Sequence, residues 1–179
     1  MKCICILTDG FEELEAVGTL ALLRRAGIQI DVAALDNNQA TGRFELTMGN
    51  LMKLDDIDVQ SYDLLFLPGG PHYAKLEQNQ RVVQIIKNFA QADKWIAAIC
   101  AAPTILGRLG LLEGKNYTCF TSMNEDFKGN YIDDYVAVDG KIITGRSAAA
   151  VIDFSFAIIE AILGKEAAEK TKQSIYYYH

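Results

Sequence analysis

Histidine, basic charge and long apolar runs are all scarce in this 179-residue sequence. It has two histidines and four cysteines, with no C-x-x-C pair and no zinc-type spacing, so we expect no metal site. The net charge of −6, with no Lys/Arg run, argues against a nucleic-acid partner. No apolar stretch reaches the ~18 residues of a membrane span, and residues 1–7 are too short for a signal sequence. These absences predict a soluble, cytoplasmic protein with no membrane partner.

Half of the residues are hydrophobic and 22% are charged, which is the balance of a folded domain with a sizeable core. A disulfide framework is not expected in a chain of this length. Cys3 and Cys5 lie two residues apart in an apolar segment and therefore share one face of a strand. We interpret both as packed core thiols rather than metal ligands.

Strand and helix patterns alternate along the chain. The patterns predict strands at 2–8, 28–35, 62–70, 95–99, 117–121, 134–140 and 141–145, with helices at 9–27, 79–92, 102–112, 148–164 and 165–173. Asp9 and Glu12 have capping-box spacing, and Asp139-Gly140 is typical of a hairpin turn. Residues 36–60 are expected to form a short hairpin or an irregular crossover. The alternation predicts one α/β domain over residues 1–179 with a mostly parallel sheet.

Cys100 lies where a predicted strand meets a predicted helix, in the segment "KWIAAICAAPTILG". Ala98 and Ala102 stand two residues before and after it, where a sharp strand-to-helix turn demands small side chains. Pro103 suits the first helical turn. Such a nucleophile elbow would expose the sulfur at a helix N-terminus and lower its pKa. The alternative is an ordinary small residue in a core strand.

Two other segments also follow strands, and in parallel sheets sites form beyond the carboxyl ends of strands. In "LPGG" the N–H of Gly70 could join that of Ala101 in an oxyanion hole, although the motif also fits a simple turn. In "EELE", Glu12 and Glu13 suit a helix start, whereas Glu15 lies further in, among small and apolar neighbours. Glu15 is either a site residue or part of a solvated helix face.

The segments "FEELEAVGTLALLRRAGI", "LLFLPGG", "IAAICAAPTILG" and "IITGRSAAAVIDFSFAIIEAILGKEAA" occur in this order. Together they resemble the ThiJ/DJ-1/PfpI superfamily over nearly the full length, most closely its DJ-1-like branch with bacterial ThiJ-type members. The resemblance implies a flavodoxin-like three-layer α/β sandwich, similar to class I glutamine amidotransferases, that forms a homodimer. No cofactor is implied.

The resemblance also implies roles for particular residues. Cys100 matches the reactive elbow cysteine, and Glu15 matches a protonated glutamate that hydrogen-bonds the sulfur. Gly70 and Ala101 match the backbone oxyanion donors. Arg25 and Arg146 match arginines placed near the dimer interface and the mouth of the site.

One position departs from the family pattern. Phe120 stands where several relatives carry a histidine, so a Cys-His-Glu peptidase triad finds no matching base. His72, after "LPGGP", is either an aid to Cys100 or a surface loop histidine. Cys119 is either a resolving thiol or a packed core thiol.

Two functions follow from the resemblance. The first is cysteine-dependent chemistry on a small aldehyde such as methylglyoxal (glyoxalase III-type), or removal of early glycation from protein thiols and amines (deglycase). The second is a non-enzymatic oxidative-stress sensor or chaperone that acts through oxidation of Cys100. An intracellular cysteine peptidase and a role in thiazole monophosphate biosynthesis rank below both.

Overall fold

A seven-stranded sheet lies at the centre of the computed structural model, which describes residues 1–178; His179, the last residue of the Tyr-rich tail, lies outside the described residues. All neighbouring strands are parallel except the last pair, β10 and β11, so the predicted flavodoxin-like α/β fold is confirmed. The strand order is β10-β11-β7-β6-β1-β2-β5. The bounds are β1 Lys2–Leu7, β2 Gln29–Ala34, β5 Met52–Lys53, β6 Leu64–Leu67, β7 Trp95–Ile99, β10 Val136–Asp139 and β11 Ile142–Gly145.

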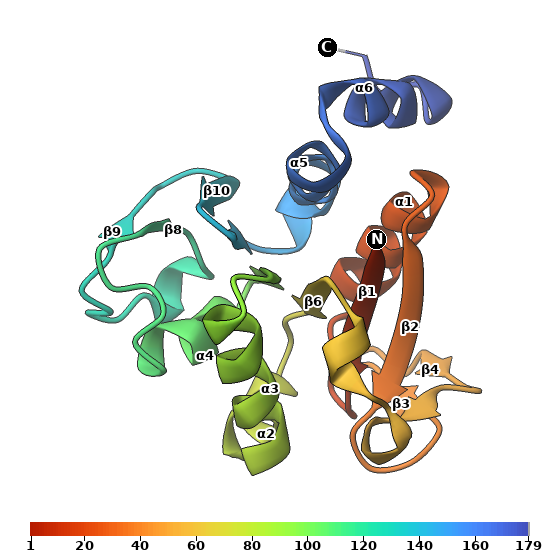
Figure 1. Ribbon diagram of the computed structural model, residues 1–179, viewed down its shortest axis with the longest axis vertical. Coiled ribbons are helices and arrows are strands. Elements are labelled where there is room, and N and C mark those ends of the chain that lie inside the picture. The colour runs from red at the N-terminus through yellow and green to blue at the C-terminus, as the bar shows by residue number, and fades with distance from the viewer. Residues whose placement is uncertain (179) are drawn as a thin grey trace.

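Helices cover both faces of this sheet, as Figure 1 shows. Side chains along a strand alternate between faces, so Ile4 and Ile6 enter one core cluster while Cys3 and Cys5 enter the other. The first cluster also takes in apolar residues of α2, α3 and α4, and the second those of α1, α5 and α6. The helices are α1 Thr19–Arg25, α2 Tyr73–Gln78, α3 Gln80–Gln91, α4 Pro103–Arg108, α5 Val151–Leu163 and α6 Lys165–Ser174.

The first helical segment starts later than its sequence pattern predicts. It begins with a π-helical turn, η1 (Leu14–Gly18), ahead of α1. The predicted capping box is wrong: the side chain of Asp9 accepts the N–H of Thr41, and the side chain of Glu12 accepts the N–H of Glu15 at 2.7 Å. Residues 9–12 therefore form a loop at the carboxyl end of β1 instead of a helical turn.

A predicted strand at 117–121 is mostly absent. Only β8 (Asn116–Tyr117) is extended there, and it pairs with β9 (Asn130–Tyr131) in a separate small sheet. The next N–H groups do not enter a ladder, because Thr118 donates to the hydroxyl of Thr144 and Phe120 donates to the carbonyl of Cys100. A short 3₁₀ turn, η4 (Thr121–Met123), follows.

The predicted hairpin at Asp139-Gly140 is confirmed, and of the two alternatives for residues 36–60 the structure contains the short hairpin. Gly140, with φ of +59°, turns the chain between β10 and β11. Within 36–60, β3 (Ala40–Thr41) pairs antiparallel with β4 (Thr47–Met48), and the turn between them projects at the carboxyl edge of the main sheet. Three further 3₁₀ turns are η2 (Leu54–Asp56), η3 (Val59–Ser61) and η5 (Ala148–Ala150). Among residues 1–178, no helix combines the length and apolar character that a bilayer crossing requires.

Candidate functional site

The chain turns sharply at Cys100, directly after β7. Its φ is +64°, in the left-handed region that strains any residue other than glycine. The turn is held on both sides: the N–H of Cys100 donates to the carbonyl of Gly145 at 2.9 Å, and its carbonyl accepts the N–H of Phe120 at 2.8 Å. Ala98 and Ala102 are fully buried beside it, as a nucleophile elbow requires. Cys100 therefore has the elbow geometry and is only partly buried.

Glu15 lies in the π-helical turn η1, and its side chain reaches this elbow. It is almost completely buried, with 1% of its surface exposed. Its Oε2 accepts the N–H of Gly69 at 3.0 Å. Gly69 packs against both groups: a Cβ there would collide with Oε2 of Glu15 and lie 2.5 Å from Cβ of Cys100. Glu15 is thus not on a solvated helix face, and its carboxyl is within hydrogen-bonding reach of the Cys100 thiol, with Gly69 packed beside both.

The two ionisable groups share one environment. The pKa of Glu15 is raised to about 7, chiefly by burial and to a smaller extent by the nearby charge of Glu12. The hydrogen bonds with Cys100 and Gly69 and the charge of Arg43 oppose this rise. Burial also raises the pKa of the Cys100 thiol, followed by the charge of Glu15 and the hydrogen bond between them. Because each negative charge disfavours the other, the pair gives up one proton around neutral pH and keeps the second.

The expectation that the elbow lowers the thiol pKa is therefore wrong. The N–H groups of Ala101 and Gly70 point at the sulfur and do lower its pKa, but burial and Glu15 outweigh them. The helix behind the elbow, α4, has six residues, so its end carries little of the macrodipole that the prediction assumed. Gly70 can bring its N–H there because its backbone is left-handed, with φ of +97°, and its Cα packs against the 10–12 backbone.

His72 is neither a surface histidine nor a partner of Cys100. It is completely buried, its Nε2 donates to the carbonyl of Pro68 at 2.9 Å, and its Nδ1 accepts the N–H of Thr8. Burial lowers its pKa to about 4, so the ring is neutral at physiological pH. His72 ties the carboxyl end of β1 to that of β6 and so fixes the loop that leads to Glu15 and the loop that carries Gly69.

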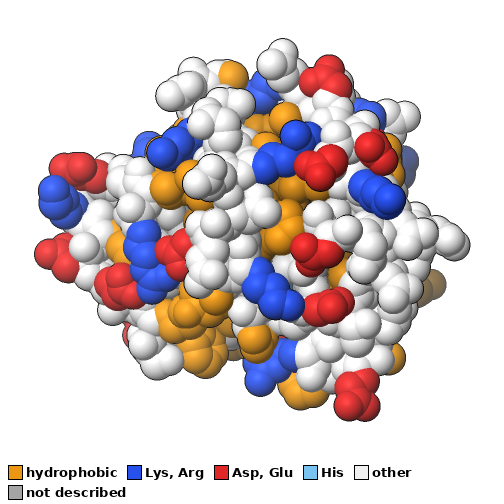
Figure 2. All heavy atoms as spheres, turned by 90° about the horizontal axis from the view of Figure 1, so that it is seen from below, with side chains coloured by type: hydrophobic (Ala, Val, Ile, Leu, Met, Phe, Trp, Pro, Cys, Tyr) orange, Lys and Arg blue, Asp and Glu red, His pale blue; other side chains and the backbone are white. Residues whose placement is uncertain are grey.

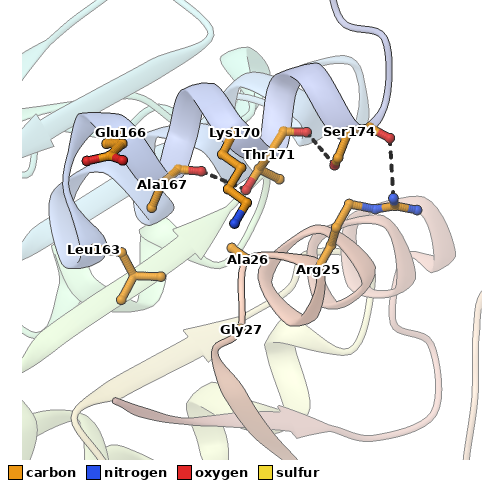
Figure 3. Close-up of a pocket in the computed structure, with 9 residues that line it drawn as sticks. All are labelled: Arg25, Ala26, Gly27, Leu163, Glu166, Ala167, Lys170, Thr171 and Ser174. Carbon is orange, nitrogen blue, oxygen red and sulfur yellow. Dashed lines mark hydrogen bonds between the residues drawn. The ribbon is translucent and has the colours of Figure 1, made fainter.

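The two predicted arginines lie apart. Arg25 ends α1, at the opposite edge of the sheet from Cys100, and its Nη1 donates to the carbonyl of Ser174 at 3.4 Å. Figure 3 shows it in a pocket between α1 and α6 that contains none of the Cys100 surroundings, so its placement at the mouth of the site is wrong. Arg146 directly follows Gly145, the residue whose carbonyl binds the Cys100 N–H, and forms an ion pair with Asp133.

Cys119 is a packed core thiol. It is fully buried in the cluster that contains α3 and α4, whereas Cys100 packs against the cluster on the other face of the sheet. Burial raises its pKa to about 11. A resolving role would require the two thiols to meet across these layers, so the structure does not support it.

A cavity of about 330 Å³ opens over Cys100. Its lining comes from four segments of the chain: Arg43, Gly70, Pro71, Tyr73, Cys100, Ala101, Phe120 and Met123. Sequence patterns missed Arg43, because it lies in the irregular stretch 36–60 and only the fold brings it to the carboxyl edge. Among residues 1–178 there is no group of three or more His, Cys, Asp or Glu side chains that could hold a metal ion.

Glu13 positions the turn that carries Arg43, a role that sequence patterns also missed. It is buried, and its Oε1 accepts the N–H of Phe44 at 2.6 Å and that of Leu46 at 3.5 Å. A Cβ at Gly42 would collide with this carboxylate, so Glu13 can bind the turn only because residue 42 is a glycine. The N–H of Arg43 donates to the carbonyl of Phe11 at 2.8 Å and completes the attachment.

An α/β sandwich with an elbow cysteine facing a buried glutamate defines a class of cysteine-containing domains, and comparison with known proteins identifies the family. The model of the DJ-1/PfpI family matches residues 1–161, so the chain belongs to that family. Protein DJ-1 homolog B of Arabidopsis thaliana is 36% identical over 166 residues, which cover 89% of this chain and 37% of that protein. This chain thus spans well under half of that relative.

Two further relatives match over most of their own length. The deglycase TK1284 of Thermococcus kodakarensis is 32% identical over 149 residues, which cover 82% of this chain and 90% of that one. The crystal structure of Drosophila melanogaster DJ-1beta superposes with a TM-score of 0.92 at 30% identity, covering 99% of this chain and 98% of the other. The single domain over residues 1–179 stays a prediction.

Replacing Gly69 tests the close approach of Glu15 and Cys100. The added methyl of Gly69→Ala has no space between the two side chains, so we expect a loss of ~1–3 kcal/mol in the free energy of unfolding, measured by urea denaturation. Gly49→Ala is the matched control, because no atom lies within 4 Å of its Cβ position. Equal urea midpoints for the two variants would show that the site can accommodate a methyl group at residue 69 and would contradict the close packing.

Proposed function

We propose that this protein is a cysteine-dependent enzyme that converts small α-oxoaldehydes to 2-hydroxy acids, with related activity on early glycation products of thiols and amines. The observation that carries the proposal is the buried carboxyl of Glu15 held against Cys100 beneath an open cavity, with two backbone N–H groups directed at the sulfur. The deglycase name of the Thermococcus relative is consistent with it.

The geometry suggests how each group acts. The Cys100 thiolate adds to the aldehyde carbon, a C–S bond forms, and the carbonyl π pair moves to oxygen. In this proposal the N–H groups of Gly70 and Ala101, which are directed at the sulfur before the reaction, stabilise that alkoxide on the adjoining carbon. Glu15 gives its proton to that alkoxide, and the carboxylate that remains, with a pKa of about 7, is suited to take a proton from this carbon and return it to the neighbouring one.

The remaining steps restore the thiol. The proton shift oxidises the aldehyde carbon to a thioester and reduces the ketone carbon to an alcohol, so no external oxidant is needed. Water then breaks the C–S bond and releases the 2-hydroxy acid, lactate in the case of methylglyoxal. A peptidase would need a base near Cys100 to activate the thiol and protonate an amine, and His72, the described histidine, is engaged elsewhere.

Lactate production from methylglyoxal tests the proposal. Cys100→Ser should reduce activity to background, and Glu15→Gln should lower kcat/KM by ~10²–10⁴-fold, because the amide cannot carry a proton between carbons. Cys3→Ala is the control, since Cys3 is a buried thiol at the amino end of β1 and should leave kcat/KM unchanged. Activity that survives Cys100→Ser would remove the proposal.

A second candidate function is redox sensing, which the solvent exposure of Cys100 favours. Of the four cysteines, Cys3, Cys5 and Cys119 are buried and Cys100 alone is partly accessible. Two equivalents of peroxide would oxidise Cys100 to the sulfinic state, and a protonated Glu15 would hydrogen-bond the product. Mass spectrometry after mild peroxide should show two added oxygens on Cys100 first. Oxidation of all four thiols at similar rates would contradict this role.

We further propose that the protein is a cytoplasmic homodimer. Four unpaired cysteines suit a reducing compartment. Three large apolar side chains, Leu14, Val17 and Ile152, are exposed on η1 and α5, two elements that contact each other, and a second copy would cover them. Sedimentation equilibrium should give twice the chain mass of 19.8 kDa, and Leu14→Glu should lower it. A mass of one chain for the unmodified protein would exclude the dimer.

A further inference from the structure

The wall of the Cys100 cavity is mostly apolar. Five of its lining residues present apolar or aromatic side chains, and Arg43 is its one charged residue; the apolar set is Pro71, Tyr73, Ala101, Phe120 and Met123. Figure 2 views the end of the molecule at which the parallel strands have their carboxyl ends, and it shows apolar side chains exposed between groups of charged ones. A surface of this kind at a reactive group marks a place where an apolar part of a ligand is buried.

We propose that the site prefers α-oxoaldehydes with an aromatic or branched apolar substituent on the ketone carbon, and that Phe120 is the main determinant of this preference. The inference rests on the proposed function and specifies its substrate class. For an aryl substrate the reaction balances as for methylglyoxal: phenylglyoxal and water give mandelate, the aldehyde carbon is oxidised, and the ketone carbon is reduced.

Phe120 is fixed relative to the reacting sulfur. Its N–H donates to the carbonyl of Cys100 at 2.8 Å, so the two residues are bonded backbone to backbone. Its own carbonyl accepts the N–H of Met123 at 2.8 Å, which folds η4 so that Met123 lines the same cavity. The position of this wall is therefore set by the elbow itself and not by a loose loop.

The ring of Phe120 does not fill the core. It is 43% exposed and belongs to neither core cluster among the described residues, although its neighbour Cys119 is fully buried. An exposed ring at a cavity wall keeps its apolar surface in water until a ligand covers it. An aryl or branched substituent bound to the carbon next to Cys100 would cover it, whereas a methyl group would leave most of it in water.

Two further lining residues, Tyr73 and Pro71, fit the same substituent. Tyr73 is the first residue of α2, and its N–H donates to the carbonyl of Gly70 at 3.1 Å, so its position is tied to the predicted oxyanion donor. Pro71 lies between them and adds a rigid apolar surface. At about 330 Å³ the cavity offers more room than a three-carbon substrate fills.

The test compares kcat/KM for phenylglyoxal and methylglyoxal in the full chain and in Phe120→Ala. The reactivities of the two aldehydes differ, so the informative quantity is the change in their ratio between proteins. We expect Phe120→Ala to lower the phenylglyoxal-to-methylglyoxal ratio about tenfold, as loss of an apolar contact does in other specificity pockets. Isobutylglyoxal should follow phenylglyoxal, which controls for aryl electronics and for the reaction of phenylglyoxal with arginine.

Tyr178→Ala is the matched control, because Tyr178 is 71% exposed and does not line the cavity. It should leave the ratio unchanged, and circular dichroism should show that both variants fold. A ratio that Phe120→Ala does not alter, with methylglyoxal still turned over, would overturn the preference and leave the proposed function standing. Absence of turnover for all three aldehydes would instead overturn the proposed function and this inference with it.

Discussion

The site depends on the close approach of a buried carboxyl and a thiol, which a residue without a side chain beside them makes possible. Gly69 packs against both Glu15 and Cys100 and donates its N–H to the carboxyl. The approach is built from three strand ends: β1 leads to Glu15, β6 leads to Gly69 and β7 leads to Cys100. The buried, neutral His72 joins the first two, and Gly145 anchors the third. Because the strands are parallel, their carboxyl ends lie at the same end of the sheet. The ionisation of Glu15 and Cys100 follows from that placement.

Burial decides the chemistry of this pair more than helix geometry does. Two groups that both resist ionisation release a single proton around neutral pH, and the resulting charge can reside on sulfur only when Glu15 holds the remaining proton. A single mobile proton of this kind serves carbon acid chemistry, in which a thiolate must attack and a carboxyl must then exchange a proton. It equally serves oxidation, in which the carboxyl stabilises a charged product.

Much of the fold was predictable, because long apolar strands and amphipathic helices carry their own periodicity. The elbow was also predictable, because the sharp turn at Cys100 requires small side chains on both sides and the sequence has Ala98 and Ala102 there. The burial of Glu13 and His72 was not, because nothing local distinguishes them from surface residues; the β3–β4 turn and the ends of two strands enclose them. Arg43 and the turn that carries it depend on contacts between residues some 30 positions apart. The raised thiol pKa was missed because desolvation is a property of the assembled site.

The pH dependence of Cys100 alkylation, compared between the natural chain and Glu15→Gln, tests the shared proton most directly. If the pair releases one proton around neutral pH, the rate of alkylation in the natural chain should rise in two steps, the lower near pH 7 and the upper above the ordinary range of a thiol. In Glu15→Gln a single step should remain, at a lower pH than the upper step, because the carboxylate charge is gone. A single step in the natural chain that Glu15→Gln leaves in place would show that the two groups ionise independently, contrary to this account.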